Sequence, residues 1–488
     1  MTERAPPVEE LDVLIVGAGI SGIAGAYHLQ KRCPDKSYAI LEARERIGGT
    51  WDLFRYPGIR SDSDMYTLGF PFRPWTGEKS IADGADIRAY VENTAREFGI
   101  DRRIRFGHRV TRADWSSVEA RWTVEAATPD GIRRYRAPFL YLGSGYYDYE
   151  QGYRPEWPGE QDYRGHLVHP QFWPEDLDHA GKRIVVIGSG ATAVTLVPAL
   201  AEKAAHVTML QRSPSWIVAR PSEDGIARRL QRLLPAKAAA RTIRWKNVLL
   251  GMLFFQRSRK RPDKVRALLL KWVGEQLPDR DISRDFVPTY NPWDQRVCLV
   301  PDGDLFRAMR EDRVSVVTDT IETFTATGIR LASGGQLEAD IVVTATGLVV
   351  KILGGIAMTV DGAPVNPPEH VSYKGMMLND VPNLVLSFGY TNASWTLKCD
   401  LTARYFCRLV RHMDGHGLDI CVPRLPADGV ERQPMLDFSS GYVQRAAASL
   451  PAQGTAPPWR VYQNYFRDFA ALGLGTVTDG VMEFRKAG

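Results

Sequence analysis

The first 42 residues contain two apolar segments separated by a glycine-rich turn. Residues 11–16 (Leu-Asp-Val-Leu-Ile-Val) are almost continuously apolar and β-branched, which predicts a buried parallel strand. Gly17-Ala-Gly-Ile-Ser-Gly22 follows, and a helical stretch then extends to about Arg32. A second strand is expected at 38–41 and ends in Glu42. Together these segments predict a β-α-β unit.

The same succession recurs once. A strand is predicted at 184–187, followed by a turn at 188–193 with the sequence Gly-Ser-Gly-Ala-Thr-Ala. A helix to about Lys203 and a strand at 207–210 complete the second unit. No other internal repeat is apparent. Two such units predict an α/β protein with two Rossmann-like dinucleotide-binding domains.

Further strands are expected around these units. Three segments resemble antiparallel strands, namely 104–110, 122–127 and 135–142. Later strands are predicted at 314–318, at 341–344 before Ala345-Thr346-Gly347, and at 384–388. A long helix from about Ala403 is expected to fold back onto the first unit.

The chain is expected to divide into three parts. The first dinucleotide-binding domain is predicted to comprise 1–150 and 378–488, and the second 151–220 and 300–377. Residues 221–299 are rich in helical sequence and break the strand pattern. They therefore predict a helical insertion in the second domain.

Composition excludes several classes of protein. The chain has 488 residues, of which 44% are hydrophobic and 24% charged, as in ordinary globular proteins. Its five cysteines form no C-x-x-C pair, which argues against zinc fingers, iron–sulfur centres and a dithiol redox centre, and no metal site is expected. The odd count suits a reducing compartment. Residues 1–10 are acidic and do not resemble a signal peptide, so a cytoplasmic location is expected.

Positive charge is concentrated in the predicted insertion. Residues 228–271 hold 14 Lys and Arg against one acid, although the net charge of the chain is only +5. No nucleic-acid fold signature accompanies this segment, so no nucleic-acid partner is expected. It also carries an apolar stripe at helical spacing, formed by Ile243, Trp245, Val248, Leu249, Met252 and Phe255. The favoured interpretation is a core-facing helix with a solvated face, and a weak peripheral membrane contact is the alternative.

The first glycine loop has the chemistry of a dinucleotide site. Gly17 suits a tight turn, Gly19 allows the backbone to approach a pyrophosphate, and Gly22 permits close helix–strand packing. The helix N-terminus presents free N–H groups and a positive dipole end to phosphates. Glu42 lies 20 residues beyond Gly22, where a carboxylate would accept hydrogen bonds from an adenosine ribose.

The second loop predicts a different dinucleotide. Gly188, Gly190 and Ala193 take the positions of the three glycines, with Ser189, Ala191 and Thr192 between them. The following strand ends in Gln211-Arg212-Ser213 instead of an acid. A ribose 2′-phosphate would be attracted by Arg212, so this site is expected to prefer NADP over NAD. Two dinucleotide sites without a dithiol indicate a flavin that is reduced by a nicotinamide and reoxidised by dioxygen.

Two further motifs carry a family resemblance. The stretch from Gly48 to Asp62, Gly-Gly-Thr-Trp-Asp-Leu-Phe-Arg-Tyr-Pro-Gly-Ile-Arg-Ser-Asp, is similar to the long fingerprint of Baeyer–Villiger monooxygenases. Residues 163–174, with Gly165, His169, Trp173 and Pro174, resemble their second fingerprint, from which Tyr163 is a mild departure. Segments 51–70, 291–296 and 389–398 are most similar to the ethionamide-activating members of that family.

The resemblance implies FAD and NADP(H) as cofactors and a C4a-peroxyflavin that attacks ketones or oxidises the sulfur of thioethers and thioamides. It implies that Arg296 stabilises the peroxide anion and that Asp62 orients this arginine. The alternatives are a flavin monooxygenase limited to N- or S-oxidation and a non-catalytic flavin-binding redox sensor.

The resemblance also implies the residues around the cofactors. Thr50, Trp51, Asp52 and Leu53 would line the flavin, with Ser21 at the pyrophosphate and Val110 at the adenine. Arg60 and Ser61 are further expected cofactor-binding residues. His169 and Trp173 would form a hinge, and Gly165 would occupy a backbone position closed to other residues. Gln295 stands where the family often has a lysine that contacts the 2′-phosphate, which leaves more of that contact to Arg212.

Overall fold

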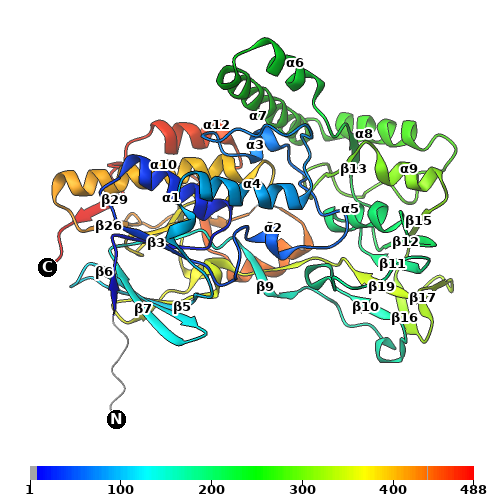
Figure 1. Ribbon diagram of the computed structural model, residues 1–488, viewed down its shortest axis with the longest axis horizontal. Helices are drawn as coiled ribbons and strands as arrows, with labels where there is room; N and C mark the ends of the chain where they lie inside the picture. The colour runs from blue at the N-terminus through cyan, green and yellow to red at the C-terminus, as the bar shows by residue number, and fades with distance from the viewer. Residues whose placement is uncertain (1–7, 437) are drawn as a thin grey trace.

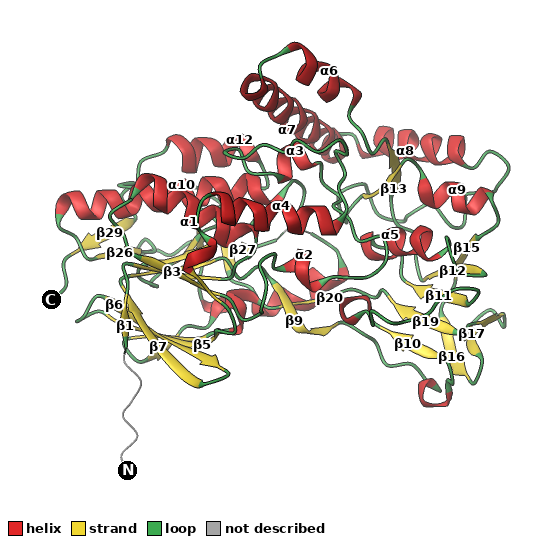
Figure 2. Cartoon of the chain, viewed as in Figure 1, coloured by secondary structure: helices red, strands yellow, loops and turns green. Residues whose placement is uncertain are grey.

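Two five-stranded parallel sheets form the frame of the protein in a computed structural model that describes residues 8–436 and 438–488 (Figures 1 and 2). The first sheet has the order β25 (Leu384–Leu386), β8 (Phe139–Leu142), β2 (Val13–Val16), β3 (Tyr38–Leu41), β4 (Ile104–Arg105). The second has the order β10 (His166–Val168), β19 (Ile341–Thr344), β11 (Arg183–Ile187), β12 (His206–Gln211), β15 (Val314–Thr318). The predicted α/β class with two Rossmann-like units is confirmed.

Helices cover the parallel strands because these strands are apolar on both faces. In the first unit, α1 (Ile20–Arg32) packs against the long helix α10 (Trp395–His416), and both contribute to one core cluster with β2, β3 and β8. In the second unit, α5 (Ala191–Leu200) packs against α9 (Asp304–Arg310). The tail therefore returns to the first unit as expected.

A third sheet covers the other face of the first parallel sheet. Its order is β1 (Glu9–Glu10), β7 (Gly131–Ala137), β6 (Arg121–Thr128), β5 (Arg109–Ser116), β21 (Ala357–Val360), β22 (Ala363–Pro364). β5, β6 and β7 pair antiparallel, and their buried residues share a core cluster with β2 and β3. Figure 2 shows this sheet at the lower left, below α1 and α10.

Three predicted element boundaries are wrong, each for a local reason. Residues 135–142 are two strands, because Pro138 ends β7 and the chain then enters the parallel sheet as β8. Residues 104–110 are also two strands, separated by a turn in which Gly107 has a φ of +66°. α10 begins at Trp395 and not near Ala403, because its first turns are buried on all sides and lack an amphipathic period.

The boundary expected at residue 377 also differs. β21 pairs in parallel with β5, so the chain has already joined the third sheet by Ala357. β20 (Leu348–Val350) pairs with β9 (Tyr147–Gly152), and this ribbon is where the chain crosses between the two units. The return to the first unit therefore occurs soon after β19.

The predicted insertion lies between two paired strands of the second unit. β13 (Ile217–Arg220) pairs in parallel with β14 (Cys298–Pro301), and between them lie α6 (Gly225–Leu233), α7 (Ala236–Lys260) and α8 (Pro262–Gln276). Ile243, Val248 and Met252 of the predicted apolar stripe are buried, as the core-facing interpretation expects. Leu249 is an exception, because its side chain is exposed.

The remaining elements are short, apart from the 14-residue helix α4. They include α2 (Thr50–Leu53), α3 (Met65–Leu68), α4 (Gly84–Glu97), α11 (Gly441–Ala446), α12 (Tyr465–Asp468), β16 (Ile321–Thr325), β17 (Gly328–Leu331), β18 (Gln336–Glu338), β23 (Ser372–Tyr373), β24 (Met377–Leu378), β26 (Ile420–Pro423), β27 (Arg432–Pro434), β28 (Ala452–Gly454) and β29 (Met482–Arg485). Across residues 8–436 and 438–488, no helix has the length and apolarity needed to cross a bilayer. Residues 1–7, which belong to the acidic N-terminal segment that does not resemble a signal peptide, lie outside the described residues.

Candidate functional site

A cavity of about 980 Å³ lies where the two parallel sheets approach each other. Its walls contain segments that follow the carboxyl ends of β2, β8, β11, β12 and β19. Ligands of open α/β sheets bind at the carboxyl ends of the strands. The cavity therefore combines the ligand-binding edges of both units in one space.

The first glycine loop forms one wall of the cavity. Gly17 has a φ of +96°, and a Cβ on Gly22 would lie 1.9 Å from the Gly17 carbonyl oxygen, so neither position accepts a side chain. Gly19 is the N-cap of α1, and no side chain caps this helix end. Its free N–H groups therefore face the cavity. The Ser21 hydroxyl accepts a hydrogen bond from the Trp395 indole at 2.8 Å.

Glu42 lies at the cavity end of β3 and is 5% exposed. One carboxylate oxygen accepts a hydrogen bond from the Ala18 N–H at 2.7 Å, and the other accepts from the Arg44 N–H at 2.9 Å. Burial raises the pKa of Glu42 above its usual value although both hydrogen bonds lower it. Each oxygen keeps a second lone pair, so the carboxylate can still accept a bond from a ribose hydroxyl.

The second glycine loop has the same construction. Gly188 has a φ of +135°, and a Cβ there would lie 2.4 Å from the Ala345 carbonyl oxygen. Gly190 caps α5 without a side-chain bond and has open space around it. Ala193, at the third position, is fully buried and packs in the core of the second unit. The other loop residues line the cavity, namely Ser189, Ala191 and Thr192.

Two cavity arginines lack a carboxylate partner. The basic side chains that line the cavity include Arg44, Arg60, Arg109, Arg212, Arg296, Lys351 and Arg445. Five of them form ion pairs, and within the described part of the chain only Arg212 and Arg445 do not. Ser213, next to Arg212, accepts a hydrogen bond from Ser189 through its carbonyl oxygen at 3.0 Å. Uncompensated guanidinium groups in a cavity are suited to binding phosphate.

Sequence reasoning missed Arg445. This residue lies on α11, far from both glycine loops in the chain, and no motif marks it. Its guanidinium lies 3.3 Å from the centroid of the Tyr153 ring, which also lines the cavity. Partial burial lowers the pKa of Arg445, because no nearby described carboxylate offsets the desolvation.

Only some of the residues that the long fingerprint was expected to place at a cofactor line the cavity. Thr50 and Trp51 line the cavity, as do Arg60 and Ser61. Asp52 and Leu53 do not, which corrects the expectation that both line a flavin. α2 is a single helical turn, so successive side chains point in different directions and cannot all face one ligand. Leu53 packs instead into the core of the second unit.

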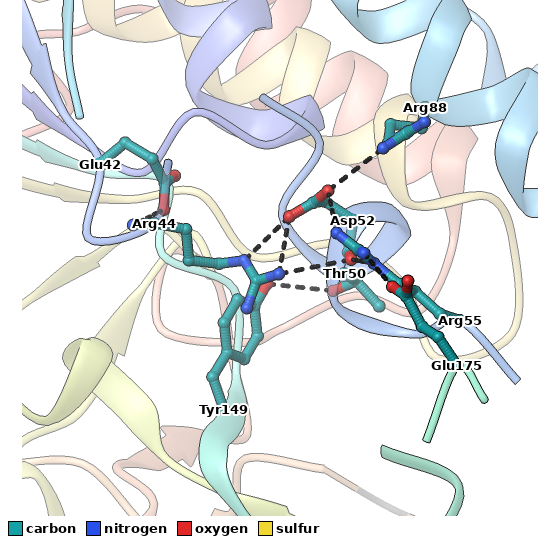
Figure 3. Close-up of polar contacts among 8 residues, drawn as sticks. All are labelled: Glu42, Arg44, Thr50, Asp52, Arg55, Arg88, Tyr149 and Glu175. Carbon is teal, nitrogen blue, oxygen red and sulfur yellow. Dashed lines mark hydrogen bonds and ion pairs between the residues drawn. The ribbon is translucent and has the colours of Figure 1, made fainter. Parts of the chain in front are cut away.

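Asp52 is the centre of a cluster of arginines (Figure 3). Its carboxylate is 2% exposed and accepts hydrogen bonds from Arg44 at 2.6 Å, from Arg55 at 3.3 Å and from Arg88 at 3.5 Å. Burial by itself would raise the pKa of Asp52, but Arg44 and the other two guanidiniums hold it below its usual value. Figure 3 also shows Thr50 beside Tyr149, whose hydroxyl lies 3.3 Å from the Thr50 hydroxyl.

We expect Asp52→Asn to destabilise the protein by about 1–3 kcal/mol at neutral pH, because charged hydrogen bonds to a buried carboxylate are lost. Since the folded pKa is depressed, this contribution is present above the unfolded pKa near 3.8 and disappears as the pH falls through the folded value. Thermal unfolding at pH 7 and between pH 5 and 3 measures both effects. The exposed carboxylate variant Asp35→Asn is the control, and an equal loss in both variants at pH 7 would contradict the role of the cluster.

Arg296 and Asp62 meet across the cavity wall, although 234 residues separate them in the chain. The guanidinium donates from Nε to one Asp62 oxygen at 2.6 Å and from Nη2 to the other at 3.0 Å. Both side chains remain partly accessible, with 31% and 29% exposed. Desolvation opposes the charged form of Arg296, but Asp62 outweighs it and raises the pKa of the arginine. The result is a fixed cation at the cavity surface.

Three tyrosines that sequence reasoning missed surround this cation. Tyr146, Tyr147 and Tyr442 line the cavity and interact electrostatically with Arg296. The Tyr146 and Tyr147 hydroxyls lie 2.8 Å apart, and the Tyr146 ring stacks on Trp395 at 5.1 Å. Burial raises the pKa of all three tyrosines, so they remain neutral hydroxyl donors at physiological pH.

The second fingerprint packs within the second unit, and its residues Gly165, His169, Trp173 and Pro174 do not line the cavity. A Cβ on Gly165 would lie 2.2 Å from the Tyr163 hydroxyl oxygen, so close approach, and not a left-handed φ, requires glycine there. The Nε2 atom of His169 lies 3.3 Å from the Gly347 carbonyl oxygen. Burial lowers the pKa of the His169 imidazole. Trp173 packs against the core of the second unit, and the Pro174 carbonyl accepts a turn hydrogen bond from Leu177.

Other predicted residues also lie at the cavity. Val110, near the start of β5, lines it, as does Gln295 beside Arg296. Arg60 forms an ion pair with Asp304 of α9 at 2.5 Å, so the long fingerprint is attached to the second unit. Thr346 donates to the Tyr153 carbonyl oxygen at 2.7 Å, which attaches the end of β19 to the segment after β9.

The residues fit two dinucleotides. Two uncapped helix N-termini, at Gly19 and Gly190, face one cavity, and each follows a glycine with positive φ. Such N-termini bind phosphate through backbone N–H groups and the helix dipole. No group of three or more metal-ligating side chains occurs among residues 8–436 and 438–488.

Relatives and solved structures match nearly the whole chain, whereas the family match covers its first half. Residues 14–235 match the family described as pyridine nucleotide-disulphide oxidoreductase. The FAD-containing monooxygenase EthA of Mycobacterium tuberculosis (strain ATCC 25618 / H37Rv) is 56% identical over 480 residues, which cover 98% of each chain. The probable FAD-binding monooxygenase AlmA of Acinetobacter sp is 48% identical over 483 residues, covering 98% of this chain and 97% of that protein.

Solved structures share the fold. Cyclohexanone monooxygenase from Rhodococcus sp. Phi1 bound to NADP+ has a TM-score of 0.78 at 20% identity, covering 99% of this chain and 100% of that chain. Oxidized steroid monooxygenase bound to NADP has a TM-score of 0.75 at 23% identity, covering 98% and 100%. The disulphide in the description of the matched family has no counterpart here, because all five cysteines are free.

Proposed function

Since the chain belongs to the family of FAD-containing monooxygenases, we propose that it uses NADPH and dioxygen to insert one oxygen atom into ketones, giving esters. The same site would oxidise the sulfur of thioethers and thioamides. The observation that carries this proposal is the bidentate ion pair of Arg296 and Asp62 at the surface of a cavity with two dinucleotide-binding loops.

We assign FAD to the first unit and NADPH to the second on the chemistry of their glycine loops. The first loop and Glu42 would hold FAD, with Thr50 and Trp51 beside its ring system. The second loop would hold NADPH, with Arg212 at the 2′-phosphate and Arg445 near another phosphate of the same dinucleotide. Bound FAD, once reduced by NADPH, supplies the activation of dioxygen.

Arg296 would stabilise negative charge that develops on oxygen during the reaction. A guanidinium stays protonated at any working pH, and Asp62 holds this one in a fixed orientation through two hydrogen bonds. A preorganised donor of this kind lowers the barrier because no reorientation is needed as the charge forms. The neutral hydroxyls of Tyr146, Tyr147 and Tyr442 would add donors at the same place.

The proposal is tested by the products that the purified flavoprotein forms. We expect NADPH consumption to rise when a linear or aryl ketone is added, and the ester to contain one 18O atom when the reaction runs under 18O2. A thioamide should give an S-oxide with the same NADPH dependence. The control is the same assay without the ketone.

Three outcomes separate the candidate functions. S-oxide without any ester would assign the enzyme to heteroatom oxidation alone. NADPH consumption that no substrate increases would favour the non-catalytic redox sensor. Ester without 18O would contradict oxygen insertion from dioxygen.

A further inference from the structure

We propose that the outer surface of α6 and α7 docks onto an anionic lipid membrane. Five large apolar side chains are exposed there, and we call this surface the α6–α7 face. They are Ile226 and Leu233 on α6, and Leu249, Leu250 and Leu253 on α7. Their exposed fractions range from 48% to 79%.

This concentration of apolar side chains is local. Thirteen large hydrophobic side chains are exposed among the described residues, and five of them lie on these two helices. Val118 and Ile132, in contrast, are isolated on the hairpins of the antiparallel sheet. Figure 1 shows α6 and the adjoining end of α7 projecting at the upper edge of the molecule, while the rest of α7 lies against α3 and α8. Single exposed apolar residues are ordinary, but a cluster marks an interaction surface.

The charge around the apolar side chains identifies the partner. Arg229 and Arg232 flank Leu233 on α6, and Arg257 and Lys260 lie one and two helical turns beyond Leu253 on α7. Over the described parts of the chain, none of these four has a carboxylate oxygen within 4.0 Å. Their charge is therefore available to an external anion.

Helical spacing places the α7 residues on one side. In the second half of α7, Leu250, Leu253, Arg257 and Lys260 follow one another at intervals of three or four residues, and Leu249 lies four residues before Leu253. Positions at such intervals share a helix face. In this half of α7 the opposite side contributes Val248 and Met252 to the core, whereas the first half is covered, with Ile243 buried against α6.

Other partners fit this surface less well. A second copy of the chain would bring two basic surfaces of like charge together, which disfavours a self-complementary contact. A nucleic acid would use the basic side chains but gains nothing from aliphatic leucines, and stacking aromatics are absent from the exposed set on these described helices. A lipid surface accepts both features, since leucines enter the acyl boundary while arginines meet anionic headgroups.

Vesicle sedimentation of the full-length flavoprotein tests the proposal. We expect it to bind vesicles of 70% phosphatidylcholine and 30% phosphatidylglycerol in 20 mM salt, and not vesicles of phosphatidylcholine alone. The bound fraction should fall as salt rises, because the Debye length shrinks to about 10 Å at 0.1 M. Free inorganic phosphate at the same ionic strength should not compete, which separates a headgroup surface from a phosphate site.

Two sets of substitutions locate the contact. Leu249→Ser, Leu250→Ser and Leu253→Ser combined should lower the bound fraction about tenfold, while oxidation of a water-soluble ketone stays unchanged and reports correct folding. Val118→Ser with Ile132→Ser removes two apolar side chains elsewhere that are 77% and 55% exposed, and should leave binding unchanged. Absence of binding at 20 mM salt, or equal binding by the leucine variant, would overturn the proposal. A dimer that the same substitutions dissociate, without vesicle binding, would assign the face to a second copy instead.

Discussion

Replacing Arg296 with alanine is expected to lower ester formation about a hundredfold to a thousandfold, while the protein keeps its FAD. Removal of one preorganised electrostatic donor typically has an effect of this size. Reduction of the flavin by NADPH needs no anion stabilisation at this point, so it should survive. The variant should then consume NADPH and release hydrogen peroxide in place of ester, which a peroxide assay and product analysis measure together.

The control for this variant is Arg109→Ala. Arg109 also lines the cavity and pairs with Glu150 at 2.7 Å, but it lies beside Val110, at the end of the cavity expected to hold adenine. Loss of its charge should change ester formation far less than loss of Arg296. Asp62→Asn keeps the arginine and weakens only its orientation, so an intermediate loss is expected. An Arg296→Ala variant that forms ester at a near wild-type rate would show that the cation comes from another residue.

The second large effect concerns the choice of nicotinamide cofactor. Arg212→Ala should raise the KM for NADPH about tenfold to a hundredfold, since a charge-assisted contact with phosphate contributes about 1.5–3 kcal/mol. The KM for NADH should change little because NADH has no 2′-phosphate. Flavin content should stay unchanged, which shows that the first site is intact. Steady-state kinetics with both cofactors gives the ratio directly.

Arg445 provides the matched control for Arg212. It is the other cavity arginine without a described carboxylate partner, so Arg445→Ala removes the same charge from the same cavity. If Arg445 meets a phosphate that NADPH and NADH share, its removal should weaken both cofactors and preserve their ratio. An unchanged NADPH/NADH ratio in Arg212→Ala would mean that another residue binds the 2′-phosphate, and Gln295, at the family's lysine position, also lines the cavity.

Local sequence was sufficient to identify the two nucleotide-binding units. Each strand is a short apolar run, and each turn requires glycine for reasons confined to neighbouring atoms, such as the 1.9 Å between a Cβ on Gly22 and the Gly17 carbonyl oxygen. The strand at 38–41 and the helix ending at Arg32 were predicted at their observed bounds. These elements can be predicted from the sequence because they depend on backbone geometry and side-chain pattern within a few residues.

The tertiary structure decided which residues face the cavity. Adjacent fingerprint residues diverge, since Thr50 and Trp51 line the cavity while Asp52 binds three arginines. Side-chain direction on a single helical turn depends on how that turn packs, which the spacing of residues does not specify. The family resemblance pointed to Arg296 and Asp62, but only folding brings these distant residues within 3.0 Å.

Tertiary structure also brings to the cavity residues that no motif marked. Arg445 and Tyr442 come from the tail, yet they lie with Tyr146 and Arg296 around one cavity. α7 shows most clearly what its sequence leaves undetermined. It is apolar on more than one side, and only the packing of neighbouring helices determines which side is exposed. The sequence thus specified the nucleotide-binding frame through local backbone requirements. The composition of the cavity and of the outer surface followed from contacts between segments far apart in the chain.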